Sequence, residues 1–288
     1  MSDPTSHLLL DPETIARSIG RLPSLPAIVL DLLQSMEDDS VSSELLAAKI
    51  SGDQALVARL LRLANSSFYG LQRKVVSIPD AMFVLGLSSV RNLALTAALS
   101  DTLGQRSKEG AFDFTAYWRH SVGVALCARA LATKFRCSRE NAFAAGLIHD
   151  IGQLVLSTCF PQHMAAVSDY QKRFDCQTNE AEWAVLGTDH GRLGEALTMS
   201  WGFPPALSDA VGGHHDPERL DASSLASLVH LADAITHALD LAGREAELVP
   251  RIYPPCWNAA GLSWAESQAI FSEVEQGFNA LCDMLSLT

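Results

Sequence analysis

The sequence predicts an all-α protein. Apolar residues recur at helical spacing along nearly the whole chain, as Leu56, Val57, Leu60 and Leu61 do within Asp53–Ala64. Residues that cap or begin helices precede several of these segments. Runs of alternating apolar and polar residues, which would predict strands, are missing, and no repeat of solenoid length is found. These observations together leave helices as the expected elements.

The first helices are expected where prolines or capping residues stand before an apolar stripe. Pro23 and Pro26 precede AIVLDLLQSM and favour a helix start there, because proline is tolerated in the first helical turn. Asp53 is the expected N-cap of the helix Asp53–Ala64, since its carboxylate can accept from the free backbone amides. The next segment, Asn65–Gly70 (NSSFYG), is interpreted as a helix end, either a packed turn or a loop that binds a ligand or partner.

Two further helices are expected before the middle of the chain. Ser77 with Pro79 opens DAMFVLGL, and Ser88 precedes SVRNLALTAALSDTL. The polar stretch Gly104–Asp113 (GQRSKEGAFD) then provides the best boundary. We therefore expect an N-terminal helical part over residues 1–108 and a helical bundle over residues 109–288. Near the end, Val249–Ser263 is either a cap over a pocket or a long connection to a final amphipathic helix.

Composition limits the classes of function. The formal net charge is −12 over 288 residues, and Lys and Arg are scattered, which disfavours non-specific DNA binding. None of the six cysteines forms a CxxC pair, so a zinc ribbon is not expected and the thiols are expected to be reduced. No signal peptide and no membrane span are expected from the apolar pattern. The expected location is cytoplasmic.

Residues that bind metals gather in the second part of the chain, where eight of the nine histidines lie from His120 onward. His–Asp stands inside the apolar run AGLIHDIGQLVL, where unsatisfied polar groups would be costly. His230 and Asp233 are three residues apart and share one helix face. The candidate ligands in chain order are His120, His149, Asp150, His190, His214, His215 and Asp233.

A helical bundle can collect such ligands around one point. Two histidines, Asp150 and Asp233 would form a mixed nitrogen and oxygen site, and the tandem histidines with His190 could hold a second ion. Such a site lowers the pKa of water and polarises a phosphoryl oxygen. A single His on an apolar helix is more often a hydrogen-bonded core residue than a ligand, but seven candidates across five segments favour a site. His7, His163 and His237 are expected at the surface.

The residues next to the candidate ligands also carry predictions. Gly146 and Gly152 flank the His–Asp pair and are expected to allow close helix packing. Trp201–Pro205 (WGFPP) is expected to stop a helix and form a packing turn. Arg119 could meet a phosphate, although an exposed arginine is the more common case.

The ordered ligands resemble the signature of the HD superfamily of metal-dependent phosphohydrolases, a His, a His–Asp pair and a distant Asp. His120, His149–Asp150 and Asp233 match those positions. More specifically, the chain resembles the bacterial HDOD (HD-related output domain) proteins over roughly residues 21–240. The matching stretches are LPSLPAIVLDLL, LVARLLRLANSSFYG, IPDAMFVLGLSSVRNLAL, YWRHSVGVALCARALA, AFAAGLIHDIGQLVL, TDHGRLGEAL, WGFPPALSDAVGGHHDP and LVHLADAIT.

The resemblance implies an HD-superfamily-like helical bundle with an additional N-terminal helical subdomain. It also implies a role in bacterial signalling or regulation, often without demonstrated catalysis. HDOD proteins are similar to HD-GYP phosphodiesterases, which hydrolyse cyclic di-GMP at a site of two or three metals. His190, His214 and His215 match the further ligands of that group.

The chain departs from the HD-GYP pattern where substrate would bind. Gln153 stands where that pattern has a Lys that contacts phosphate, so a neutral amide replaces a cation. Ala116 stands four residues before His120, where a Glu would add a ligand, and DPERL follows the tandem histidines without a Gly-Tyr-Pro segment. The resemblance therefore implies that the metal ligands are largely present while the substrate-binding set is depleted.

Two classes of function follow for this chain. The first and preferred one is a signalling module that binds a partner protein or a nucleotide, with an HD-type metal site and little or no phosphodiesterase activity. The second is an active phosphohydrolase acting on a nucleotide or cyclic dinucleotide, with Asp150 as the catalytic residue. The expected cofactor is one or more divalent ions, Fe, Mn, Ni, Zn or Mg. Nucleic-acid binding at the small basic spot GLQRKVV is a third, weaker alternative that the acidic charge disfavours.

Overall fold

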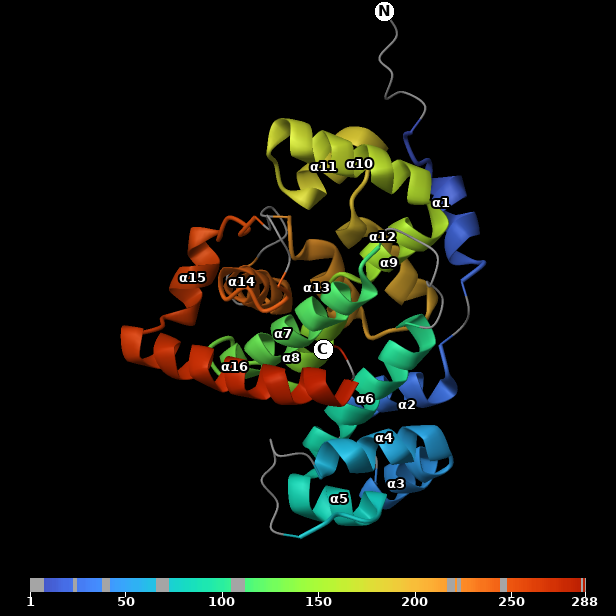
Figure 1. The fold of residues 1–288 in the computed structure, drawn as a ribbon, viewed down its shortest axis with the longest axis vertical. Coiled ribbons are helices and arrows are strands. Elements are labelled where there is room, and N and C mark those ends of the chain that lie inside the picture. The colour runs from blue at the N-terminus through green and yellow to red at the C-terminus, as the bar shows by residue number, and fades with distance from the viewer. Residues whose placement is uncertain are drawn as a thin grey trace, which may run out of the picture.

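The structure, a computed structural model, describes residues 8–22, 25–37, 42–65, 73–104, 112–216, 221, 224–243, 248–285 and 287. Within these ranges every regular element is an α-helix and no strand occurs, which confirms the all-α prediction (Figure 1). The helices before the expected boundary are α1 (Pro12–Ile19), α2 (Ala27–Glu37), α3 (Ser43–Ser51), α4 (Gln54–Ala64), α5 (Ile78–Leu85) and α6 (Leu87–Gly104).

The helices after the expected boundary carry the histidines. They are α7 (Phe114–Leu131), α8 (Arg139–Ile148), α9 (Ile151–Cys159), α10 (Pro161–Phe174), α11 (Thr178–Leu186), α12 (His190–Ser200), α13 (Pro205–Gly213), α14 (Leu225–Ala238), α15 (Pro254–Ala260) and α16 (Trp264–Leu285). Single residues explain where α12 ends and α13 begins. Gly202 takes a positive φ of 74° after α12, and Pro205 occupies the first position of α13. Trp201–Pro205 is thus the helix stop and turn that we expected.

The predicted caps of two early helices are confirmed. The Asp53 carboxylate accepts from the Leu56 amide at 3.0 Å, and the Ser77 hydroxyl accepts from the Asp80 amide at 3.2 Å. The expected bounds of the next pair are wrong by a few residues. Gly86, with φ 83°, ends α5, and α6 already begins at Leu87, so the expected start after Ser88 lies two residues late.

One side chain, Asn65, holds the end of α4. The amide of Asn65 donates to the carbonyls of Leu61 and Val75, and its oxygen accepts from the Val75 amide at 2.8 Å. Asn65 therefore ties the end of α4 to the chain ten residues later. The other residues of Asn65–Gly70 lie outside the described residues, so the choice between a turn and a binding loop stays open.

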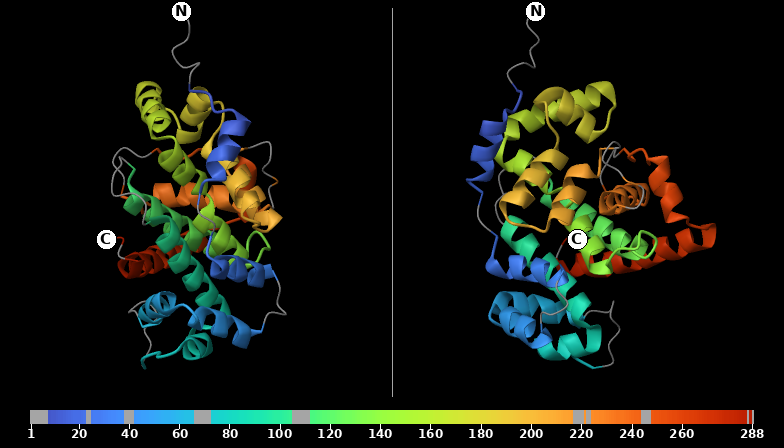
Figure 2. Two further views of the ribbon diagram at one scale, coloured as in Figure 1. Left: turned by 90° about the vertical axis from the view of Figure 1, so that its right-hand side faces the viewer. Right: turned by 180° about the vertical axis from the view of Figure 1, so that it is seen from behind.

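Figures 1 and 2 show how the helices are distributed along the long axis. The helices α3, α4 and α5 form one end of the molecule, α10 and α11 form the opposite end, and α7, α8 and α14 lie between them (Figure 1). The helix α6 packs against α2, α4 and α5 and also against α8, so one continuous apolar core joins both parts. Residues 105–111 lie outside the described residues, and the division at residue 108 stays a prediction. The helix α1 contacts α9 and α12 of the later part.

The helices that carry the candidate ligands approach one another at glycines. A Cβ on Gly146 would lie 2.8 Å from the Cα of Ala125 on α7, and one on Gly152 would lie 1.9 Å from the carbonyl oxygen of His190. Both distances are shorter than van der Waals contact. The expectation that these two glycines permit close helix packing is confirmed, and the glycine at 152 brings α9 onto the start of α12.

The apolar segment around the His–Asp pair is a broken helix in the core. α8 ends at Ile148 and α9 begins at Ile151, so the pair lies at the junction rather than inside one helix. Arg139–Cys159 is long and apolar enough to cross a membrane by length and composition alone, yet 78% of its most apolar window is buried inside the protein. A core helix passes the same test. The late stretch Val249–Ser263 contains α15, which packs against α14.

Candidate metal centre

All seven predicted ligands lie in one group, in which His215 is half-buried and the other six are buried. His120 comes from the middle of α7, His149 and Asp150 from the α8–α9 junction, and Asp233 from α14. His190 begins α12, and the tandem histidines follow the end of α13. We call this set the His/Asp cluster: His120, His149, Asp150, His190, His214, His215 and Asp233.

One end of the cluster is built around Asp233. Its Oδ1 lies 3.0 Å from Nε2 of His120 and 3.8 Å from Nε2 of His149. The two imidazole Nε2 atoms are 3.2 Å apart. These side chains are at most 2% exposed, so three ligand atoms from three helices converge in the protein interior.

The other end is built around Asp150. Its Oδ1 lies 3.1 Å from Nε2 of His190 and 3.6 Å from Nε2 of His214, and His215 completes this group. Its second oxygen, Oδ2, lies 3.5 Å from Nε2 of His149 and 3.9 Å from Nε2 of His120. Asp150 therefore lies between both ends and can provide one oxygen to each.

The unsatisfied atoms of the cluster fit a divalent metal. Among the described residues, several buried cluster atoms make no aligned hydrogen bond although they approach one another: Asp150 Oδ1, Asp233 Oδ1 and Oδ2, His190 Nε2 and His214 Nε2. Buried polar atoms without partners are costly. Ions held about 2.0–2.2 Å from nitrogen and oxygen ligands keep neighbouring ligand atoms about 3–4 Å apart, which matches these separations.

Backbone carbonyls orient two of the histidines. Nδ1 of His149 donates to the carbonyl of Gly146 at 2.8 Å, and Nδ1 of His214 donates to the carbonyl of Val211 at 2.7 Å. A carbonyl can only accept, so Nδ1 carries the proton in both rings and the lone pair of each Nε2 faces the cluster. Histidines that bind metals are held in this way by the partners of their other nitrogen.

A carboxylate that the sequence analysis missed orients a third histidine. Oε2 of Glu182, which is fully buried on α11, accepts from Nδ1 of His190 at 2.6 Å and from its backbone amide at 2.8 Å. The helical spacing could have revealed this residue, because Glu182 lies three and four residues before Val185 and Leu186 and shares their buried face of α11. A glutamate at an apolar helical position indicates a buried partner.

Burial and neighbouring charges set the protonation of the histidines. Burial lowers the pKa of His149 to about 4, which keeps this ring neutral at pH 7 and able to bind a metal. Burial would also lower the pKa of His190, but Glu182 and Asp150 outweigh it and raise that pKa well above its usual range. A metal bound at Nε2 of His190 must therefore displace a proton.

The two aspartates stay ionised despite their burial. Burial would raise the pKa of Asp150, but His149 and His190 outweigh it and hold that pKa well below the usual range. Burial acts in the same direction on Asp233, but the imidazoles of His120 and His237 close to its carboxylate outweigh burial and hold the pKa well below the usual range. The cluster therefore offers two anionic carboxylates to a cation.

The family is decided by a match over more than half of the chain. The model of the HDOD domain matches residues 22–217, well over half of the sequence. The chain belongs to the HDOD domain family. The HD-superfamily resemblance drawn from the ordered ligands is thereby confirmed.

Relatives of this HDOD protein share its fold over most of its length. A crystal structure of an HDOD domain protein of unknown function from Geobacter sulfurreducens has a TM-score of 0.80 at 26% identity, covering 95% of this chain and 99% of that one. A provisionally named phosphohydrolase from Shewanella amazonensis SB2B has a TM-score of 0.74 at 26% identity, covering 94% and 97%. An uncharacterised protein of Treponema pallidum is 25% identical over 203 residues, which is 70% of this chain and 39% of that protein. The chain spans well under half the length of the curated relatives it matches.

Two other histidines of this HDOD protein differ from expectation. His230 faces away from the cluster, because its Nδ1 donates to the carbonyl of His214 at 2.8 Å and its Nε2 accepts from the Tyr253 amide at 2.9 Å. The prediction that His237 lies at the surface is wrong. Its side chain is 14% exposed, and its Nε2 lies 3.2 Å from Oδ1 of Asp233, one helical turn earlier. The spacing of four residues was the signal that could have revealed this pair.

Arg119 neither faces a phosphate site nor lies free at the surface. Its guanidinium donates to the carbonyls of Leu241, Ala242 and Leu287 and stacks over the ring of Phe278 at 5.0 Å. Arg119 therefore fixes the end of the chain to α7 instead of binding substrate.

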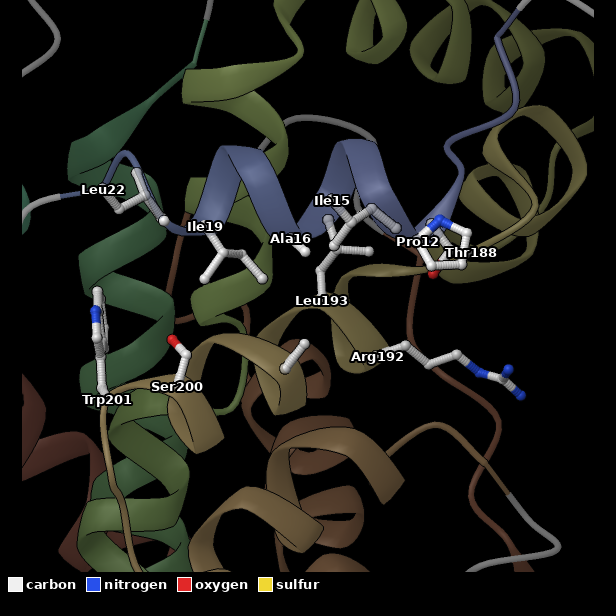
Figure 3. A pocket seen from close by; sticks show the side chains of 12 residues that line it. Pro12, Ile15, Ala16, Ile19, Leu22, Thr188, Arg192, Leu193, Ser200 and Trp201 are labelled. Carbon is white, nitrogen blue, oxygen red and sulfur yellow. The ribbon is translucent and has the colours of Figure 1, made fainter.

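An apolar groove lies between α1 and α12, apart from the His/Asp cluster. The groove has a volume of about 610 Å³. Figure 3 shows Ile15 and Ile19 of α1 opposite α12, while the side chain of Arg192 points away from these apolar residues. The groove holds none of the cluster residues, although α12 also carries His190 at its first position. The lining residues are Pro12, Ile15, Ala16, Ile19, Gly20, Leu22, Thr188, Arg192, Leu193, Ala196, Ser200 and Trp201.

Proposed function

We propose that this chain is a regulatory HDOD module that binds a divalent metal ion through the His/Asp cluster and hydrolyses phosphodiesters slowly or not at all. The convergence of buried, unsatisfied ligand atoms around Asp150 and Asp233 supports metal binding. The cluster offers imidazole and carboxylate ligands, which suit Fe, Mn, Ni or Zn better than Mg. A bound divalent ion would polarise a phosphoryl oxygen and lower the pKa of water.

The contact of Gln153 carries the second half of the proposal. Its Nε2 donates to Oδ2 of Asp150 at 2.7 Å, so the amide is occupied in holding a ligand. In the resembling HD-GYP pattern a lysine at this position contacts substrate phosphate. A neutral amide bound to Asp150 gives a phosphate no positive charge, which removes a source of transition-state stabilisation. The module therefore acts by binding a signalling protein or a nucleotide.

Metal analysis and a hydrolysis assay on the same preparation test this proposal. The purified chain is stripped with a chelator, reloaded separately with Mn, Fe, Ni or Zn, and analysed for metal content. It is then assayed on cyclic di-GMP and on a chromogenic phosphodiester. We expect bound metal that Asp150→Asn removes, with no turnover above the stripped protein. Robust metal-dependent hydrolysis that Asp150→Ala abolishes would overturn the regulatory assignment.

An active phosphohydrolase is the second candidate function. The neutral ring of His149 and the anionic Asp150 favour it, since both are in the protonation state that a catalytic metal site needs. In this case Asp150 is the catalytic residue that helps to hold the ion. Gln153→Lys distinguishes the two candidates, because a gain of hydrolysis only in this variant shows that the cation is what the natural chain lacks. Equal hydrolysis in both chains favours the active enzyme.

A further inference from the structure

His237 extends the cluster beyond the seven residues considered so far. It lies on α14 one turn after Asp233, and its Nε2 is 3.2 Å from Oδ1 of Asp233. The same oxygen is 3.0 Å from Nε2 of His120. The rings of His120 and His237 are 4.5 Å apart between centroids. Ligand atoms of these three residues all lie within 4.8 Å of one another.

These three residues form a group at the opposite end from His190, His214 and His215. Asp150 is the carboxylate of the group with His190, His214 and His215, whereas Asp233 is the carboxylate of the group with His120 and His237. Both oxygens of Asp233 are buried and make no aligned hydrogen bond among the described residues. The carboxylate therefore has the capacity to bind a cation in addition to its contacts with the two imidazoles.

We propose that His237 is a metal ligand, and that with His120 and Asp233 it holds the divalent transition-metal ion at the Asp233 end of the cluster. The inference rests on the proposed metal-binding function of the cluster. Two imidazoles and one carboxylate favour Zn, Fe, Co or Ni over Mg or Ca. The side chain of His237 is 14% exposed while those of Asp233 and His120 are at most 2% exposed, so His237 is the ligand nearest to solvent in this group.

The alternative role for His237 is to position Asp233 by donating a hydrogen bond to it. Glutamine can replace the imidazole as a hydrogen-bond donor but is a poor ligand for transition metals. Cysteine cannot replace the bond in the same way, yet its thiolate binds these metals strongly. His237→Gln and His237→Cys therefore separate a ligand from a positioning residue.

Cobalt titration of the full chain provides the test. The stripped protein, His237→Gln, His237→Cys and the control His163→Gln are titrated with Co²⁺ and followed by visible absorption and elemental analysis. His163 is on α10 and belongs to none of the three ligand groups. We expect His237→Gln to lose one equivalent of cobalt or to bind it at least tenfold more weakly, with the remaining cobalt unchanged. His237→Cys should restore that equivalent and add a thiolate-to-cobalt absorption band in the near ultraviolet.

The outcomes separate this inference from the proposed function. If His237→Gln binds as much cobalt as the unmodified chain with the same affinity, and His237→Cys shows no thiolate band, His237 is not a ligand, while metal binding by the rest of the cluster stands. If the unmodified chain binds no cobalt, both the inference and the metal-binding proposal fail. A circular dichroism spectrum of each variant confirms that a loss of cobalt does not come from unfolding.

Discussion

The helices α2–α6 and the helices around the His/Asp cluster share one apolar core, but the buried hydroxyls of Ser35 and Thr96 and the buried aspartates of the cluster have their partners in different places. In the first region, the hydroxyl of Ser35 donates to the carbonyl of Leu32, and that of Thr96 donates to the carbonyl of Asn92. These bonds are local and stay within one helix. In the second region, polar atoms of α7, α12, α14 and the α8–α9 junction meet across helices.

The location of the hydrogen-bond partner distinguishes a buried polar group that only has to be satisfied from one that takes part in a binding site. A hydroxyl that bonds to its own helix satisfies itself and requires no neighbour. Asp150 and Asp233 also contact residues far away in the chain, and part of their hydrogen-bonding capacity stays unsatisfied among the described residues. Stability and ligand binding should therefore respond to changes in different regions.

The largest expected effect is on stability and comes from the first region. Leu60 on α4 is 1% exposed, so Leu60→Ala leaves a cavity and should lower the free energy of unfolding by about 2–5 kcal/mol. Leu45→Ala is the matched control, because Leu45 is 53% exposed and should change stability by less than about 0.5 kcal/mol. Urea unfolding measures both. Metal content per folded molecule should stay constant, and its loss in Leu60→Ala would show that the regions are not separable.

The second expected effect joins stability to metal binding. A Cβ in Gly152→Ala would lie 1.9 Å from the backbone oxygen of His190, and a backbone atom cannot move aside cheaply. We expect a loss of about 3 kcal/mol in the free energy of unfolding, at the upper end of overpacking, together with weaker metal binding because α9 and α12 must separate. Gly20→Ala is the control, since its Cβ meets only ordinary contact at 3.4 Å. Equal stability of the two variants would contradict the packing argument.

The sequence predicted the helical fold because each helix carries its own evidence. The stripe of Leu56, Leu60 and Ala64 and the Asp53 cap are local, and the structure contains them as expected. The break between α8 and α9 was missed, because AFAAGLIHDIGQLVL is apolar on both sides of the His–Asp pair and no proline interrupts it. Helix ends of this kind depend on packing against other helices.

The candidate site was predictable by residue type and order but not by its supporting contacts. The seven candidate ligands stood out as His and Asp in apolar surroundings, and the structure brings them together. Glu182 was missed because its partner His190 is eight residues away across a turn, outside helical spacing. Gln153 was interpreted only as a lost cation, since a sequence does not show that its amide holds Asp150. Such contacts depend on how helices meet.

The third expected effect falls on metal binding alone. Glu182→Gln keeps the shape of the side chain but removes the charge that holds His190, so metal affinity should fall about 10–100-fold. Isothermal titration with Zn²⁺ measures this change, and the stability of the stripped protein should change less than in Leu60→Ala. Glu275→Gln, at an exposed position of α16, is the control for a lost negative charge. Unchanged affinity in Glu182→Gln would mean that His190 needs no anionic partner.

The smallest expected effect is a pH dependence outside both regions. Hydrogen bonds from Lys134 and from Ser263 lower the pKa of the Glu266 carboxyl to about 2, and Nζ of Lys134 lies 2.5 Å from it. A depressed folded-state pKa contributes stability above the unfolded value, near 4.5, and this contribution is lost as the pH falls toward 2. Metal-free wild type should therefore be more stable than metal-free Lys134→Gln at pH 5. This difference in the free energy of unfolding should shrink toward about pH 3, because the Glu266 carboxylate becomes protonated first in the unfolded chain. Because this pair is exposed, the difference should also shrink in high salt, and a difference that is constant with pH would show that Lys134 contributes by packing instead.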